Sequence, residues 1–170
     1  GARSLINNND PSVTYTGAWT YGSGRATTEY GQDIHETATN GNYLEFAFNG
    51  TDVDLIGTCA SNRGTADVYI DGFLQGSINL YSATDAFRRT VFSKTGLTRG
   101  THTLKVVKTG GTYLTVDAFR VTELINSDDP SLTYSGNWSS MASAAAIEGE
   151  VRETNTNNDS MSFNFEGNGV

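Results

Sequence analysis

Aromatic and planar polar side chains lie in the segments that the sequence places between strands, and such side chains suit the binding of sugars. Sugar rings present flat apolar C–H faces that stack on aromatic rings, and hydroxyls that pair with planar polar groups. A glycine-rich segment around Trp19 carries several of these residues, and others lie in later turns. The candidates for glycan binding are Trp19, Tyr21, Arg25, Tyr30, His35, Arg63 and Tyr81.

The residue types that most often carry catalysis are sparse. The two histidines, His35 and His102, are far apart in the chain, and the one cysteine, Cys59, ends an expected strand. The sequence has no Gly-x-Ser-x-Gly or His-Glu-x-x-His motif, which serine hydrolases and zinc peptidases use. Carboxylates are numerous, so counting does not exclude a glycosidase pair. The expectation is a protein without catalytic activity.

Runs of asparagine and aspartate before Pro11 and Pro130 offer oxygen ligands for a cation. Asp10, Asp128 and Asp129 are the candidate ligands of a structural calcium ion, although the spacing is not that of an EF-hand. The same residue types are equally expected as turn formers before proline. The sequence requires no catalytic cofactor.

Charge and composition exclude several partners. The 170-residue chain has a formal net charge of −8 and a sequence pI of about 4.6, which disfavours contact with nucleic acid phosphates. Apolar runs are too short for a membrane-spanning helix. A single cysteine cannot form an internal disulfide. Nineteen glycines and only two prolines, with many β-branched and aromatic residues, are typical of a turn-rich β protein.

The chain contains an internal repeat. The segment from Ile6 to Trp19 recurs from Ile125 to Trp138 with the same Asp-Pro-Ser and Tyr-x-Gly-x-Trp pattern, and 35–37 and 46–50 recur as 152–154 and 163–167. The predicted organisation is one complete unit over residues 1–123, followed over 124–170 by the N-terminal part of a second copy.

The repeat bears on the binding candidates. Trp19 recurs as Trp138, as a residue that packs in the core would. Two readings of Trp19 stay open: it packs in the core, or it faces solvent. Tyr21, Arg25 and Tyr30 have no counterpart in the second copy. Residues that vary while the surrounding pattern persists are the better candidates for recognition.

Alternating apolar and polar residues predict strands over 43–48, 53–57, 66–70, 73–80, 89–93, 102–108 and 113–121. Asp71-Gly72 is a strong signal for a tight hairpin turn. Residues 141–147 have a helical composition but are expected to form a turn or loop. The predicted class is an all-β antiparallel sandwich or jelly roll.

The order of several short motifs resembles the galactose-binding-like jelly-roll modules found, often in tandem, in secreted bacterial glycoside hydrolases and cell-surface proteins. The motifs are Tyr15-x-Gly17-x-Trp19, Phe46-x-Phe48-x-Gly50-Thr51-x-Val53-x-Leu55, Val68-Tyr69-Ile70-Asp71-Gly72, Gly100-x-His102-Thr103-Leu104-x-Val106 and Val116-Asp117-Ala118-Phe119. The resemblance implies a fold and a glycan-binding or surface-anchoring role, but transfers no binding residues, because the motif residues are mostly structural.

Two functions are compatible with these observations. The first is a non-catalytic carbohydrate-binding accessory module, extracellular or on a bacterial cell surface, whose partner is a glycan or polysaccharide. The alternative is a structural repeat of an extracellular fibre, adhesin or surface layer that associates with itself through 124–170, where unpaired strand edges would complete a neighbouring copy.

Overall fold

The computed structural model describes residues 2–25, 28–123, 125–146 and 149–164. The chain divides into two compact units, the first over residues 3–123 and the second over 124–170 together with the first two residues. No helix in the described ranges has the length and apolar character to cross a membrane.

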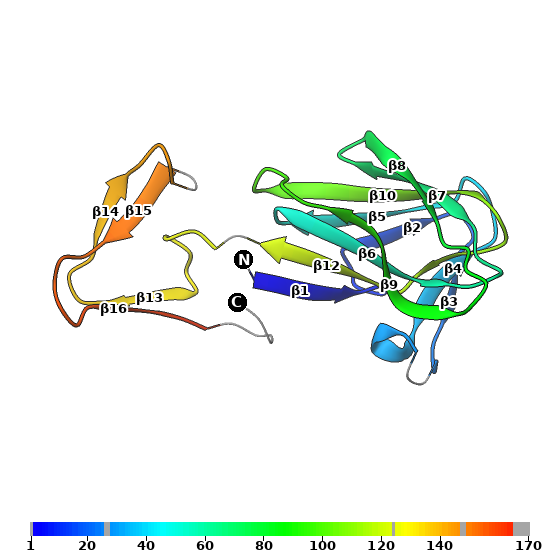
Figure 1. Ribbon diagram of the computed structural model, residues 1–170, viewed down its shortest axis with the longest axis horizontal. Coiled ribbons are helices and arrows are strands. Elements are labelled where there is room, and N and C mark those ends of the chain that lie inside the picture. Colours follow the sequence, from blue (N-terminus) through cyan, green and yellow to red (C-terminus); the bar gives the residue numbers. More distant parts are fainter. Residues whose placement is uncertain (1, 26–27, 124, 147–148, 165–170) are drawn as a thin grey trace. The chain divides into compact units, whose positions relative to one another are not determined.

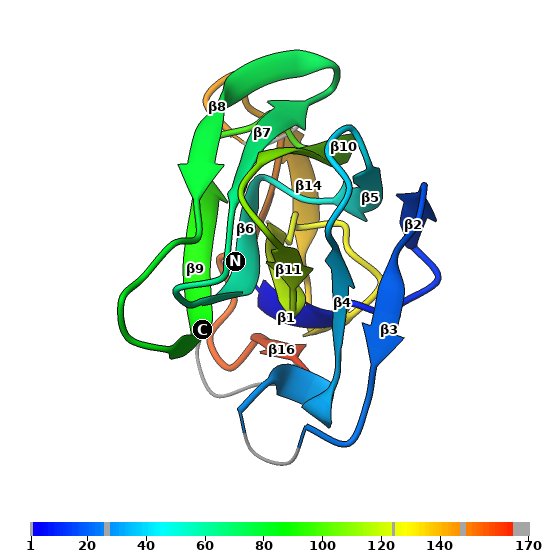
Figure 2. The same ribbon diagram turned by 90° about the vertical axis from the view of Figure 1, so that its right-hand side faces the viewer.

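The first unit is built from antiparallel sheets that lie over one another (Figure 1). One sheet has the order β1-β12-β6-β9, the second β2-β5-β10-β7-β8, and a small third sheet β11-β4-β3. The strands are β1 (Ala2–Asn7), β2 (Val13–Thr16), β3 (Thr20–Gly22), β4 (Ile34–Thr37), β5 (Tyr43–Asn49), β6 (Asp52–Cys59), β7 (Thr65–Ile70), β8 (Phe73–Asn79), β9 (Ala86–Lys94), β10 (Thr101–Gly110), β11 (Leu114–Val116) and β12 (Ala118–Glu123). One short 3-10 turn, η1 (Tyr30–Gln32), precedes β4 near one end of the sandwich (Figure 2).

Alternation places the core between the two large sheets. Along β10 every second side chain from His102 to Lys108 is buried, and β7 alternates in the same way. The rings of Phe46 on β5 and Phe119 on β12 stack across the sheets with centroids 4.2 Å apart. The hairpin turn is also as predicted, because Asp71 and Gly72 both have positive φ, at 52° and 82°, between β7 and β8. The predicted all-β sandwich class is confirmed.

The strand predicted over 113–121 is wrong in one respect, because the structure divides it at Asp117. β11 pairs with β4 in the small sheet, whereas β12 pairs with β6 in a large sheet. The backbone N–H of Asp117 donates to the carbonyl of Ile56 (3.0 Å), and its carboxylate accepts the N–H of Tyr30 (2.8 Å). A buried acidic side chain thus marks the point where the chain changes sheets.

The second unit has four described strands, β13 (Leu132–Ser135), β14 (Ser139–Ala142), β15 (Glu150–Glu153) and β16 (Ser160–Phe163). β13 pairs with β16 and β14 with β15, as β2 pairs with β5 and β3 with β4. The expectation of a loop over 141–147 was wrong for Met141 and Ala142, which belong to β14, and Ile147 lies outside the described residues.

The same local contacts occur within each of the two units. The Tyr15 hydroxyl donates to the carbonyl of Asn8 (2.7 Å), and the Tyr134 hydroxyl donates to that of Ser127 (2.8 Å). The indole nitrogens of the two tryptophans each donate to the carbonyl three residues earlier. Opposite Tyr21 the first unit has His35, whereas the corresponding pair in the second unit is Ser140 and Arg152. Self-association through 124–170 is a separate prediction that these contacts do not test.

Candidate functional site

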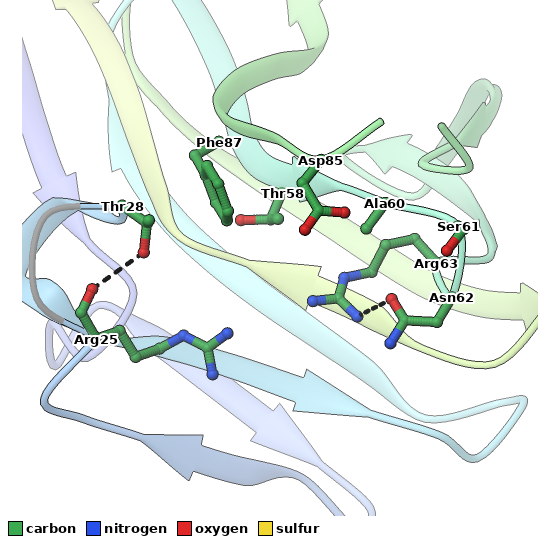
Figure 3. A pocket seen from close by; sticks show the side chains of 9 residues that line it. All are labelled: Arg25, Thr28, Thr58, Ala60, Ser61, Asn62, Arg63, Asp85 and Phe87. Carbon is green, nitrogen blue, oxygen red and sulfur yellow. Dashed lines mark hydrogen bonds between the residues drawn. The ribbon is translucent and has the colours of Figure 1, made fainter. Parts of the chain in front are cut away.

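The larger of two hollows that contain predicted residues has a volume of about 560 Å³ and lies on the first unit. We call it the arginine cleft. Segments far apart in the sequence form it, namely the chain between β3 and η1, the end of β6, the β6–β7 turn, and the start of β9 (Figure 3). Its lining residues are Arg25, Thr28, Thr58, Ala60, Ser61, Asn62, Arg63, Asp85 and Phe87.

Backbone hydrogen bonds hold the side of the cleft that carries Arg63. The N–H of Arg63 closes a turn onto the carbonyl of Ala60 (3.1 Å), and Ala60 forms an isolated bridge with Tyr81. The N–H of Gly64 donates to the carbonyl of Tyr113 (2.8 Å), and the guanidinium of Arg63 lies 5.9 Å from the centroid of the Tyr113 ring. The turn is therefore tied to two neighbouring segments, which fixes the base of the Arg63 side chain.

A buried carboxylate holds the opposite side. Arg25 Nε lies 3.4 Å from Glu29 Oε1, and the Glu29 side chain is fully buried. Glu29 also accepts hydrogen bonds from the hydroxyls of Thr28 and Thr58. The N–H of Arg25 donates to the carbonyl of Gln32 (3.0 Å). Arg25 is thus anchored at its backbone and at its Nε atom, which leaves the end of its guanidinium beside the hollow (Figure 3).

Two polar groups in the arginine cleft, Arg63 Nε and the Asp85 carboxylate, have no hydrogen-bond partner among the described residues. Arg63 donates through Nη1 to Asn62 Oδ1 (2.6 Å), but its Nε atom has no hydrogen-bond partner in the described chain. Asp85 forms no hydrogen bond or ion pair with any described residue. The Phe87 ring is 39% exposed at the same hollow. An aromatic face beside uncommitted donors and acceptors is what a sugar ring requires.

A second hollow of about 410 Å³ contains other predicted residues, and its lining is Asn9, Asp10, Pro11, Val13, Tyr15, Tyr21 and His35. We call it the Tyr21 hollow. The Tyr21 hydroxyl donates to Asp33 Oδ2 (2.7 Å), and this hydrogen bond raises the pKa of Tyr21. His35 stacks on Tyr15 at 4.0 Å with its Nδ1 atom 2.6 Å from Asn8 Oδ1, and burial lowers the pKa of His35. Most polar side chains here therefore have internal partners already.

Beneath the Tyr21 hollow lies a buried network that the sequence did not reveal. Asp33 is 3% exposed and accepts hydrogen bonds from the side-chain amides of Asn7, Asn8 and Asn9, as well as from Tyr21. The asparagine run is predicted to offer oxygen ligands, but in the structure the side-chain amides of Asn7, Asn8 and Asn9 donate to Asp33. The sequence could not show this role, because Asp33 lies far from the asparagines along the chain.

Asp117 lies close to the same network. It is fully buried, and its Oδ2 atom has no hydrogen-bond partner among the described residues. Burial is the main cause that raises the pKa of Asp117 to about 7, with Glu29 and Asp33 adding like charge nearby. The Val-Asp-Ala-Phe motif was the one signal that pointed to this residue.

The remaining candidates line neither hollow. Trp19 is partly buried against the core and tilted against Tyr15 at 4.9 Å. Tyr30 lies under the guanidinium of Arg88, at 4.7 Å. Tyr81 is 58% exposed and follows β8 beside Ala60, so it is next to the arginine cleft. The structure therefore groups Arg25 and Arg63 in one hollow, Tyr21 and His35 in another, and leaves the other three outside both.

Two of the proposed calcium ligands, Asp10 and Asp129, accept hydrogen bonds within their own turns. Asp10 Oδ1 accepts the N–H (2.9 Å) and the hydroxyl (2.6 Å) of Ser12, which lowers the pKa of Asp10, and Asp129 holds Ser131 in the same way. No group of three histidine, cysteine, aspartate or glutamate side chains in the described ranges is arranged to hold a metal ion. Calcium binding by Asp10, Asp128 and Asp129 stays a prediction.

Comparisons with known proteins agree with an association with carbohydrate-active enzymes. No protein-family model matches the chain. It is 31% identical over 166 residues to the A type blood alpha-D-galactosamine galactosaminidase of Flavonifractor plautii, which covers 91% of this chain and 15% of that protein. It is 34% identical over 106 residues to the A type blood N-acetyl-alpha-D-galactosamine deacetylase of the same organism, covering 60% of this chain and 13% of that protein.

A solved structure shows the likeness in fold. The CBM36-1 domain of a multidomain xylanase from the hindgut metagenome of Trinervitermes trinervoides superposes with a TM-score of 0.51 at 14% identity, covering 72% of this chain and 98% of that domain. The chain is thus a β-rich module similar to small parts of bacterial carbohydrate-active enzymes.

Proposed function

We propose that the first unit is a non-catalytic carbohydrate-binding module that binds a glycan in the arginine cleft. The observation that carries this proposal is the exposed Phe87 ring in the same hollow as Arg63 and Asp85, neither of which forms an ion pair with a described residue. The ring would stack on one face of a sugar, while Arg63, Asn62 and Asp85 would pair with its hydroxyls. The cleft volume of about 560 Å³ is ample for a monosaccharide or disaccharide.

The position of similar segments within larger proteins supports a binding role. The two relatives are enzymes by name, and this chain matches only 15% and 13% of their lengths. A module of that size attached to a catalytic domain would raise the local concentration of substrate by holding the enzyme on its glycan. We extend the proposal to an extracellular or cell-surface setting in a bacterium.

The cleft itself carries a single carboxylate among its described lining residues, Asp85. Hydrolysis of a glycosidic bond ordinarily uses two carboxylates that face each other across the scissile bond. His102, the histidine outside both hollows, is held between Asp71 and the carbonyl of Thr98. These placements favour binding over catalysis.

The first test is a glycan microarray probed with the 170-residue chain, with and without calcium. We expect selective binding, with sugars of the galactose series as first candidates because of the relatives' names. Binding that depends on calcium would indicate a cation site beyond the arrangements found among the described residues. A blank array would contradict the proposal.

Substitution then locates the site. We expect Phe87→Ala to raise Kd about tenfold, because losing an aromatic stacking contact costs about 1.5 kcal/mol. Phe73→Ala is the matched control, since Phe73 is 74% exposed on β8 and lines neither hollow. If Tyr21→Ala abolishes binding and Phe87→Ala does not, the glycan occupies the Tyr21 hollow instead.

A further inference from the structure

We propose that the arginine cleft recognises a sugar bearing an acid group, a carboxylate or a sulfate ester, which Arg25 and Arg63 hold between them. This inference rests on the proposed glycan-binding function and adds the chemical class of the ligand. It depends on how the charged side chains are arranged around the hollow.

The two guanidinium groups extend toward each other from opposite sides of the cleft (Figure 3). An anion between them would balance the charge of Arg63, which has no carboxylate partner among the described residues. A guanidinium presents several N–H donors in a plane, which matches the paired oxygens of a carboxylate or sulfate. The geometry therefore favours an acid group over a hydroxyl alone.

No carboxylate of the described residues neutralises the charge on Arg63. Its one hydrogen bond through Nη1 goes to the neutral amide of Asn62, and no carboxylate of the described residues is in ion-pair distance. Arg25 differs, because buried Glu29 balances its charge and fixes its orientation. Arg63 would thus supply most of the attraction, and Arg25 would supply directed donors.

Basic residues line the cleft although the chain as a whole is acidic. Arg88 and Arg89 directly follow the lining residue Phe87 on β9, and the charges of Arg89 and Arg63 both act on the Cys59 thiol at the end of β6. Arg25 and Arg63 are thus the basic residues of the described lining, with Arg89 near Arg63, in a chain whose net charge is −8. Asp85 is the acidic exception in the lining, and it would accept hydrogen bonds from sugar hydroxyls while weakening the attraction for an anion.

The test compares sugars that differ only at one substituent. NMR titrations of the 170-residue chain at low salt would use D-galacturonate against D-galactose, and D-glucuronate against D-glucose, with D-galactosamine as a cationic arm. We expect at least one acidic sugar to bind about tenfold more tightly than its neutral partner. The preference should shrink on adding 0.5 M NaCl, because salt screens the charge.

Variants assign the preference to the cleft. Arg63→Gln should abolish it, Arg63→Lys should keep part of it, and Asp85→Asn should strengthen it. Arg3→Gln removes the same charge at an exposed position outside the cleft and should leave the preference unchanged. If Arg63→Gln does not fold, the salt dependence and the Asp85→Asn variant still decide the question.

Three outcomes would overturn the inference. These are equal binding of acidic and neutral sugars, tighter binding of galactosamine, and an acid preference that survives Arg63→Gln in a folded protein. Binding of neutral sugars that depends on Phe87 would leave the proposed function standing while this inference falls. Failure of every sugar, together with a blank array of acidic and neutral glycans, would remove both.

Discussion

Lys108 is a charged residue in the core of the first unit, and its removal tests how the loop beside the arginine cleft is held. The residue is 1% exposed, and its ammonium donates to Asn40 Oδ1 (2.6 Å) and to the carbonyls of Gly110 (3.1 Å) and Gly111 (2.8 Å). Those two glycines pack against Gly64, which directly follows Arg63. Lys108 therefore links β10 to the segment that supports the cleft.

The expected magnitude follows from these contacts. Hydrogen bonds from a charged donor contribute about 1.5 to 3 kcal/mol each. Burial lowers the pKa of Lys108, which shows that desolvation of the ammonium offsets part of this gain. We expect Lys108→Met, which keeps the apolar stem and removes the donors, to lower the free energy of unfolding by about 2 kcal/mol.

Urea denaturation of the full chain, followed by tryptophan fluorescence in a Trp138→Phe background, would report the first unit through Trp19. Lys105→Met is the matched control on the same strand. Its ammonium lies over the Tyr43 ring at 3.8 Å and 3.6 Å from Glu45, with the side chain 34% exposed, so we expect a loss below about 0.5 kcal/mol. A loss for Lys108→Met no larger than that of the control would refute the reasoning.

Three further predictions concern stability. The pKa of His102 is raised, chiefly by its contact with the Thr98 carbonyl and then by Asp71, so the stability that His102 contributes should be complete below pH 6.5 and fall as pH rises through its folded pKa. The pKa of Asp71 is lowered, so stability should also fall as pH drops below 3.8. Urea titrations should show both changes in the wild type, and His102→Gln should lose the one at high pH. Gly17→Ala should cost about 2 kcal/mol, because φ is +95° and a Cβ would collide with the Asn42 side chain, whereas Gly24→Ala at φ +72° in open space should cost about half as much, and equal midpoints would contradict this. Tyr15→Phe should cost about 1 kcal/mol in the same assay through loss of the hydrogen bond to Asn8, and an unchanged midpoint would count against a role for that bond.

The sequence alone was sufficient for the fold class. In β5, β7 and β10 successive side chains point to opposite faces of the sheet, so burying one face requires apolar residues at every second position. The Asp71-Gly72 turn was also readable, because positive φ at two successive positions restricts the residue types there. These are local properties, so they can be read without knowing which strand pairs with which.

The short strands β1 to β4 were less visible because few residues in each are buried on one side, so alternation has little length in which to show. The break at Asp117 was hidden for a different reason. Val116 and Ala118 are both buried, and only the pairing of β11 with β4 and of β12 with β6 separates them. The pattern of apolar residues shows that a residue is buried, but not in which sheet its strand pairs.

The candidate site shows the same division. Residue type alone marked Arg25 and Arg63 as able to bind a sugar, but their meeting in one hollow depends on how the β3–η1 segment and the β6–β7 turn are placed by different sheets. Phe87 and Asp85 were missed because no local pattern distinguishes an aromatic in a cleft from one on an open strand. Whether a polar group is free for a ligand depends on its partners, as Tyr21 and Asp33 show, and partners distant in sequence are set only by the tertiary structure.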